Sequence, residues 1–197
     1  MVRERGVMGK DRRVKRTRQC FRNALISLLQ EHRFTIITVQ DIANKADINR
    51  VTFYSHYQDK DDLLNDIMDT LLADMVQAMR KTENPQHDSY YAISLSLFSF
   101  VGEHFHIFRV LLHEGNVPVF WGRMFSALHQ FFYEKIASSD HELTTDDRDL
   151  YSYYFSSVFI SVIQQWIMNR IKYMPSHLAE IMSDIMSKSP RKIIYKK

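Results

Sequence analysis

The stretch Thr38–Leu64, TVQDIANKADINRVTFYSHYQDKDDLL, decides how this chain folds. Thr38, followed three residues later by Asp41, has the pattern of a capping box, in which two side chains satisfy free amides at the start of a helix. The apolar residues that come next recur at the spacing of one helix face. They predict a short helix over residues 39–45 and are Val39, Ile42, Ala43 and Ala46.

A tight turn and a third helix are expected directly after this segment. Asp47 stands where such a turn favours a residue that tolerates left-handed backbone, and Asn49 is a good N-cap for a helix through Tyr57. Asp59 and Asp62 repeat the cap pattern at the start of a fourth helix, which the apolar spacing extends to about residue 80. The central stretch is therefore helix, turn, helix, followed by a longer helix.

The rest of the chain also has helical periodicity. Apolar residues predict a helix over residues 12–31, with its charges on the opposite face. The polar segment 81–89 is expected to be a loop, and helices are predicted beyond it over residues 89–104, 106–114, 118–138, 145–173 and 176–187. We therefore predict an all-α chain of two domains, a three-helix domain with a basic N-terminal arm (residues 1–59) and a larger helical domain (residues 60–197).

Composition agrees with a helical globular protein. The 197 residues are 45% apolar and 13% aromatic, which is too apolar and aromatic for a disordered chain. Only five Gly and four Pro are present, and this scarcity of turn residues favours helices over a many-stranded sheet. The lone Cys20 excludes an internal disulfide and fits a reducing cytoplasm, which is the expected location.

Basic residues are concentrated toward the N-terminus. Residues 1–60 hold 13 Lys and Arg against 6 acidic residues, whereas residues 61–197 hold 13 against 17. Such asymmetry is expected when one end of a chain faces a polyanion, although a solvated basic arm produces it as well. The densest run precedes the first apolar stripe and consists of Arg12, Arg13, Lys15, Arg16 and Arg18.

A short helix, a tight turn and another helix within a basic segment form a helix-turn-helix arrangement. The second helix of such a unit enters the major groove of DNA. In the predicted packing, Ile42, Ala43 and Phe53 join the helices to each other. The side chains left facing outward are Asn49, Arg50, Thr52, Ser55 and His56.

The same residues closely resemble the DNA-binding signature of the TetR/AcrR family of bacterial transcriptional regulators, which is roughly T-x-x-x-I-A-x-x-A-G-V-S-x-G-T-F-Y-x-H-F-x-x-K-x-x-L. The match runs through Thr38–Leu64 and includes T-F-Y-x-H-Y and D-K-x-D-L. Two positions depart from it, because Asp47 replaces the turn glycine and Val51 replaces the small residue that usually opens the recognition helix. A branched side chain there can touch a thymine methyl group, so base preference is not carried over from relatives.

The resemblance implies a role for each outward residue. Residues expected to contact phosphates are Thr38, Tyr54, His56 and Lys60, and those expected nearest to base edges are Arg50, Val51 and Thr52, with Asn49 and Ser55 on the same surface. Other roles stay open: Thr38 as an N-cap only, Tyr54 as packing, and Lys60 as a solvated charge. The basic arm with Arg12, Arg13, Lys15 and Arg16 is expected either to follow the DNA backbone or the minor groove, or to stay in solvent.

The larger domain is expected to bind a small hydrophobic effector, because the resembled family binds such molecules among its helices. A ligand cavity is mostly apolar with few polar groups. The candidate pocket residues are Phe98, His104, Phe108, Trp121, Phe125, His129, Tyr154 and Gln165. The competing explanation is that large aromatic side chains at helical spacing fill a core.

Several functional classes lack support in the sequence. We find no glycine-rich phosphate loop, G-x-S-x-G, H-E-x-x-H or paired cysteines, so neither an enzyme nor a cofactor is predicted. His104, His106 and His113 with nearby glutamates lack a recognised ligand spacing, so no metal is expected. Residues 150–168 carry no formal charge, but serines and glutamines interrupt them, and no membrane association is expected.

The sequence as a whole predicts a regulator that binds a palindromic operator as a homodimer. Two-fold symmetry places two recognition helices about 34 to 36 Å apart, or a multiple of that distance, on double-stranded DNA. The resemblance implies repression by promoter occlusion and release by a small effector. Two alternatives are a regulator whose C-terminal domain docks a protein partner without any effector, and a helical enzyme with an incidental N-terminal motif.

Overall fold

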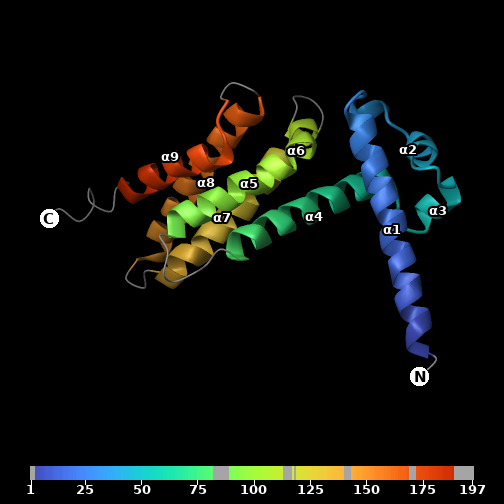
Figure 1. Cartoon of the computed structure of the whole chain (residues 1–197), viewed down its shortest axis with the longest axis horizontal. Helices are drawn as coiled ribbons and strands as arrows, with labels where there is room; N and C mark the ends of the chain where they lie inside the picture. The colour runs from blue at the N-terminus through green and yellow to red at the C-terminus, as the bar shows by residue number, and fades with distance from the viewer. Residues whose placement is uncertain are drawn as a thin grey trace. The chain divides into compact units, whose positions relative to one another are not determined.

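A computed structural model describes residues 3–81, 89–112, 117, 119–139, 143–168 and 172–188, and every regular element in this part of the chain is a helix (Figure 1). The predicted all-α fold is confirmed. The elements are α1 (Arg3–Leu29), the 3-10 helix η1 (Phe34–Ile36), α2 (Val39–Ala46), α3 (Arg50–Tyr54), α4 (Lys60–Lys81), α5 (Ser89–Glu103), α6 (Phe105–Leu112), α7 (Val119–Ser139), α8 (Thr145–Ile167) and α9 (Pro175–Lys188).

Three helix ends differ from the predicted ones. Helix α1 begins at Arg3 rather than near residue 12, since residues 3–11 are helical without an apolar stripe. Helix α3 ends at Tyr54, and the next residues to Tyr57 continue as hydrogen-bonded turns. Helix α8 ends at Ile167 rather than near residue 173; Met168 caps it, and residues 172–174 are not helical.

The chain divides within α4, between Thr70 and Leu71, into two compact units. The first unit packs α1, α2, α3 and the start of α4 around fully buried Phe21 and Phe53, whose rings meet edge to face at 5.2 Å. Leu25, Ile42 and Leu63 complete this core. Helices α2 and α3, with eight and five residues, are too short to be stable alone, so burial of these side chains holds them in the unit. The predicted functional boundary between residues 59 and 60 stays a prediction.

The second unit runs mainly from Leu71 onward and is a bundle in which α5 packs along α9 and α7 packs along α8. Its interior is aromatic: Phe132 stacks on Phe159 at 5.3 Å, and Phe98 lies 5.8 Å from Phe159. Gly102 of α5 allows a close approach, since a Cβ atom there would lie 3.4 Å from Trp166 and 3.5 Å from Pro175. Large rings therefore fill the space between these helices.

In the described parts of the chain no single helix is both long and apolar enough to span a bilayer. Residues 90–112 reach that level of apolarity only when α5 and α6 are taken together, and the two helices meet at a bend of 80°.

Candidate nucleic-acid interface

Helix α2 starts at the capping box predicted from the sequence. The Thr38 side chain accepts a hydrogen bond from the Asp41 amide (3.2 Å), and the Asp41 carboxylate accepts one from the Thr38 amide (2.9 Å). The Thr38 hydroxyl also donates to that carboxylate at 2.6 Å. These hydrogen bonds from Thr38 lower the pKa of Asp41. Thr38 is exposed, so its oxygen lies at the surface even though its proton is already shared with Asp41.

The turn between α2 and α3 is as tight as the sequence predicts. Asp47 has φ 53° and ψ 42°, in the left-handed region, which confirms its expected role. Its backbone amide bonds to carbonyls of the last turn of α2. Asn49 then caps α3 by accepting a hydrogen bond from the Val51 amide at 2.8 Å. The backbone path into α3 is therefore set by two local side chains.

Helix α3 is anchored by one side chain and exposes the others. Phe53 is fully buried against Phe21, whereas Val51 is 77% exposed and Tyr54 is 48% exposed. The Arg50 guanidinium donates to the Tyr54 hydroxyl at 2.9 Å and lies 5.4 Å from the centre of its ring. A cation, a branched apolar group and a phenol thus form one exposed face, a combination suited to guanine, thymine methyl and phosphate.

The other predicted contact residues of this segment differ in exposure. The Ser55 hydroxyl is exposed and donates to the Thr52 carbonyl at 2.7 Å. Thr52 and His56 are half-buried, and the His56 ring lies 6.4 Å from the Phe21 ring. The structure therefore places the predicted residues from Asn49 to His56 on one short segment.

The Lys60 side chain does not extend into solvent but is bound to backbone carbonyl groups. Its Nζ donates to the carbonyl oxygens of Phe34 (2.8 Å), Thr35 (3.2 Å) and Ile37 (2.8 Å), and it lies 4.6 Å from the centre of the Phe34 ring. An ammonium group has three protons to donate, so all three are used by the segment that leads into Thr38. The predicted phosphate contact of Lys60 stays a prediction.

A polar network that the sequence analysis missed joins α1 to α4. Arg22 makes a two-pronged ion pair with Asp66 (2.8 and 2.9 Å) and donates to Thr70 at 3.0 Å. The Tyr57 hydroxyl donates to the same carboxylate at 2.7 Å. Burial alone would raise the pKa of Asp66, but the hydrogen bonds from Arg22 and Tyr57 lower it. Burial and this hydrogen bond raise the pKa of Tyr57.

The eight predicted effector-pocket residues differ in burial and in neighbours, and their role in a pocket stays a prediction. Phe98 and Phe108 are fully buried among other rings, and a His104 ring nitrogen lies 2.9 Å from the Phe100 carbonyl. Phe125 stacks on His129, whose Nε2 lies 3.2 Å from Asp149, on the side where α7 meets α8. Trp121 and Gln165 are half-buried, and Tyr154 is 39% exposed.

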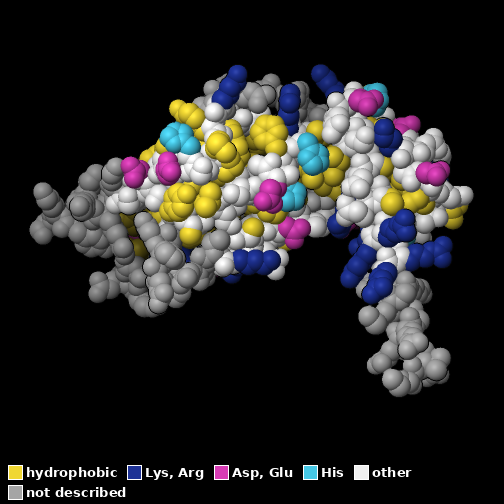
Figure 2. Space-filling model, in the orientation of Figure 1, with side chains coloured by type: hydrophobic (Ala, Val, Ile, Leu, Met, Phe, Trp, Pro, Cys, Tyr) yellow, Lys and Arg dark blue, Asp and Glu magenta, His cyan; other side chains and the backbone are white. Residues whose placement is uncertain are grey.

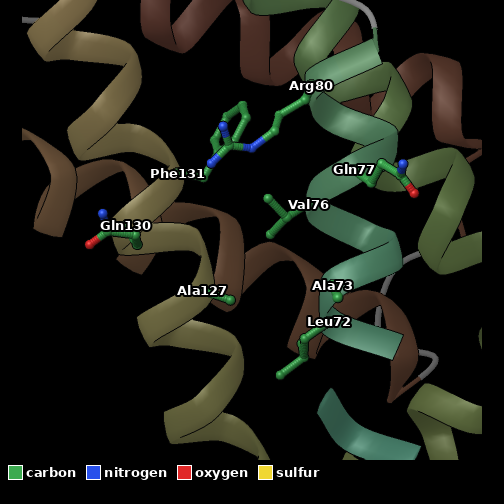
Figure 3. A pocket seen from close by; sticks show the side chains of 8 residues that line it. All are labelled: Leu72, Ala73, Val76, Gln77, Arg80, Ala127, Gln130 and Phe131. Carbon is green, nitrogen blue, oxygen red and sulfur yellow. The ribbon is translucent and has the colours of Figure 1, made fainter. Parts of the chain in front are cut away.

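A groove of about 370 Å³ lies instead between α4 and α7 (Figure 3). Figure 3 shows Leu72 and Val76 pointing from α4 toward α7, and Arg80 reaching across toward Phe131. Arg80 donates to Glu134, which also accepts from Gln130 at 2.7 Å. None of the eight predicted pocket residues lines this groove, whose wall is formed by Leu72, Ala73, Val76, Gln77, Arg80, Ala127, Gln130 and Phe131. Spacing showed both apolar stripes but not that they face each other.

The described residues offer no group of three or more His, Cys, Asp or Glu side chains that could hold a metal ion.

Comparison with known proteins shows which family this chain is related to. Residues 23–67 match the family model of bacterial regulatory proteins of the tetR family, and residues 88–188 match TetR_C_8, a transcriptional regulator C-terminal region. The uncharacterized HTH-type transcriptional regulator YxbF of Bacillus subtilis (strain 168) is 31% identical over 160 residues, which are 78% of this chain and 40% of that protein. The chain thus spans about two fifths of the length of this curated relative.

Solved structures share the fold. A TetR transcriptional regulator from Streptococcus agalactiae 2603V superposes with a TM-score of 0.65 at 26% identity, covering 91% of this chain and 98% of that one. The dihydroxyacetone kinase operon activator DhaS gives a TM-score of 0.61 at 19% identity, over 87% and 92% of the two chains, which shows likeness of fold alone. From these matches and the helix-turn-helix geometry we conclude that the chain belongs to the TetR family of bacterial regulatory proteins.

Proposed function

We propose that the protein binds a palindromic operator as a homodimer and represses transcription by occupying a promoter. The observation that carries this proposal is the exposed face of α3, where Arg50, Val51 and Tyr54 stand above buried Phe53. In the proposed complex, Arg50, Val51 and Thr52 read base edges, and Thr38, Tyr54 and His56 contact phosphates. Asn49 and Ser55 border the same surface.

Lys60 has a different place in this proposal. Since its ammonium donates to three backbone carbonyls, it holds the η1 segment and thereby the position of Thr38. It stabilises the backbone that positions the interface, and it would have to break one of these hydrogen bonds in order to bind a phosphate.

A dimer through α8 and α9 is supported by apolar side chains that the single chain leaves exposed. Leu150 and Tyr153 of α8 are 66% and 57% exposed, and Ile181 and Ile185 of α9, one turn apart, are 37% and 39% exposed. A two-fold interface uses the same patch on both subunits, so the copies of each of these side chains in both subunits would be buried. One five-residue recognition helix reads few bases, and a second copy would double the length of DNA that is read.

We place a small hydrophobic effector beside α4. The α4–α7 groove has a volume within the range of about 300 to 1,000 Å³ that is typical of ligand sites, and its wall is mostly apolar. A ligand there would touch the helix that continues from the DNA-binding unit. It would release DNA only if it bound the DNA-free conformation more tightly than the DNA-bound one. The pocket predicted around Phe98 and His129 remains an alternative location.

The open form of the same groove favours one second candidate, in which a partner's helix docks there and the protein acts with a coregulator. One protein of the same fold, DhaS, is named an operon activator, so the sign of regulation need not be repression. A helix laid in a groove binds through apolar side chains spaced one turn apart, which matches the α4 and α7 stripes that form the wall.

The testing experiment is selection of bound duplexes from a random DNA pool, followed by footprinting. The expected result is a palindrome with two half-sites, protected by a protein that elutes as a dimer. Arg50→Ala should change the selected half-site, while Lys45→Ala, an exposed cation of α2, should leave it unchanged. A monomer that selects no common sequence would overturn the proposal, and a reporter gene behind the selected site would give the sign of regulation.

A further inference from the structure

The first half of α1 extends beyond the packed core of its unit. The helix begins at Arg3 (Figure 1). Among its side chains that the structure describes, which start at Arg12, those up to Cys20 are exposed or half-buried and the first buried one is Phe21. At 1.5 Å per residue the stretch before Phe21 is roughly 27 Å long. The described residues Arg12–Cys20 therefore gain little stability from packing against their own unit.

Charge is concentrated in the same stretch. Between Arg3 and Arg18 the sequence has eight Lys and Arg residues against two acidic ones, Glu4 and Asp11. Figure 2 shows Lys and Arg side chains gathered on the described part of this helix. Like charges three or four residues apart destabilise an isolated helix, so nearby anions would stabilise this one.

Three of these cations form a defined surface. Arg12, Arg13 and Arg16 are exposed, and within the described structure none of them is paired with a carboxylate. On a helix of 3.6 residues per turn Arg12 and Arg16 lie on the side away from Phe21, and Arg13 lies between that side and the side that faces the core. Arg18 and Arg22 point elsewhere, since Arg18 lies 5.3 Å above the Tyr57 ring and Arg22 binds Asp66. We call Arg12, Arg13 and Arg16 the arm cations.

We propose that the arm cations form a second DNA-contacting surface, which binds phosphates beside the base pairs read by α3. Duplex DNA carries one negative charge per about 1.7 Å of its axis, so a helix of this length spans many phosphates. The inference builds on the proposed operator binding because α1 and α3 belong to one compact unit and would approach the same duplex. Phosphate contacts of this kind add affinity without choosing a sequence.

The test compares the salt dependence of DNA binding for the wild type and the variant Arg12→Ala/Arg13→Ala/Arg16→Ala. Alanine is the best helix former, so the variant keeps α1 helical, which circular dichroism checks. The matched control removes three exposed cations of the second unit, Lys81→Ala/Arg109→Ala/Lys172→Ala. Both variants lose three positive charges, so any difference in their salt dependence is due to where in the protein the charges were removed.

The slope of log Kobs against log salt concentration falls by about 0.9 for each phosphate that the protein no longer binds. A dimer has six arm cations, so we expect the variant's slope to fall by roughly 3 to 5, while the control keeps the wild-type slope. Trimming the base pairs that flank the selected site should weaken the wild type but not the arm variant. Base preference should be the same in both.

Equal slopes for the arm variant and the wild type would overturn the inference, as would an equal fall in the control, which would show an effect of net charge alone. This experiment can fail or succeed independently of the proposed operator binding. If no sequence is selected but the arm variant still loses slope on a random duplex, the operator proposal fails and the arm surface is supported. Loss of binding to anionic lipid vesicles with an unchanged DNA slope would assign the arm to a membrane and also overturn it.

Discussion

Replacing Lys60 with methionine separates a residue that positions the interface from one that binds phosphate. Methionine keeps an apolar stem of similar length and removes the ammonium. The carbonyl oxygens of Phe34, Thr35 and Ile37 are then left without the donor that now lies 2.8 to 3.2 Å away. Because the removed donor is charged and half-buried, the change should affect folding stability as well as DNA binding.

The magnitude follows from those hydrogen bonds. A hydrogen bond to a charged group contributes about 1.5 to 3 kcal/mol, but water can reach the half-exposed site and replace part of it, so we expect a total loss of about 2 kcal/mol for Lys60→Met. For a chain of this size that loss lowers Tm by roughly 4 to 8 °C. If Lys60 instead bound one phosphate in each subunit of a dimer, its removal would reduce the salt slope by about 1.8.

The assay is thermal unfolding together with fluorescence anisotropy on the selected operator, between about 50 and 200 mM salt. We expect a lower Tm, weaker binding and an unchanged salt slope. Lys60→Arg keeps the charge, but a planar guanidinium cannot direct three protons from one nitrogen, so it should restore little stability. The control Lys45→Met should leave Tm in place. An unchanged Tm with a slope reduced by about 1.8, restored by Lys60→Arg, would refute the positioning role.

Three further predictions concern other residues of the first unit. Arg50→Ala should cost about 1 to 3 kcal/mol of discrimination at one base pair of each half-site, measured by competition between operator variants, and unchanged preference would contradict the assignment. Phe53→Ala should lower the free energy of unfolding by about 3 to 5 kcal/mol because its ring is fully buried, and a loss below about 1 kcal/mol in denaturant titration would show a less packed core. The pKa of Asp66 is lowered in the folded protein, so its carboxylate stabilises the fold above the ordinary carboxyl pKa, and this contribution disappears as pH falls through the folded value. Asp66→Asn should therefore flatten the decline in unfolding free energy between roughly pH 5 and 2, and parallel curves for the two proteins would disprove the coupling.

Local patterns were sufficient for the elements that form the proposed DNA interface. The capping box of Thr38 and Asp41, the left-handed Asp47 and the Asn49 cap were all predicted from neighbours within a few residues, and the structure confirms them. Each feature depends on hydrogen bonds that span at most four residues, so the order of residues nearly specifies the geometry. The start of α1 was missed because residues 3–11 are helical without an apolar stripe that would mark them.

Features made by distant residues could not be predicted in the same way. The sequence shows Lys60 after a turn, but not that it reaches carbonyls 23 to 26 residues earlier. It shows aromatic residues at helical spacing from Phe98 to Tyr154, but not that Phe98 meets Phe159 or that Phe125 stacks on His129. It shows the stripes of α4 and α7, but not the groove between them.

The sequence by itself determined helix α2, the turn that follows it and the start of α3, since caps and helical periodicity act over one or two turns. Only the tertiary structure decided that Arg22, Tyr57 and Asp66 meet, and that Leu72 and Phe131 border one groove. Such pairs lie far apart along the chain and come together only when whole helices bury their apolar faces, and the partner of a buried face is chosen by packing of the complete fold.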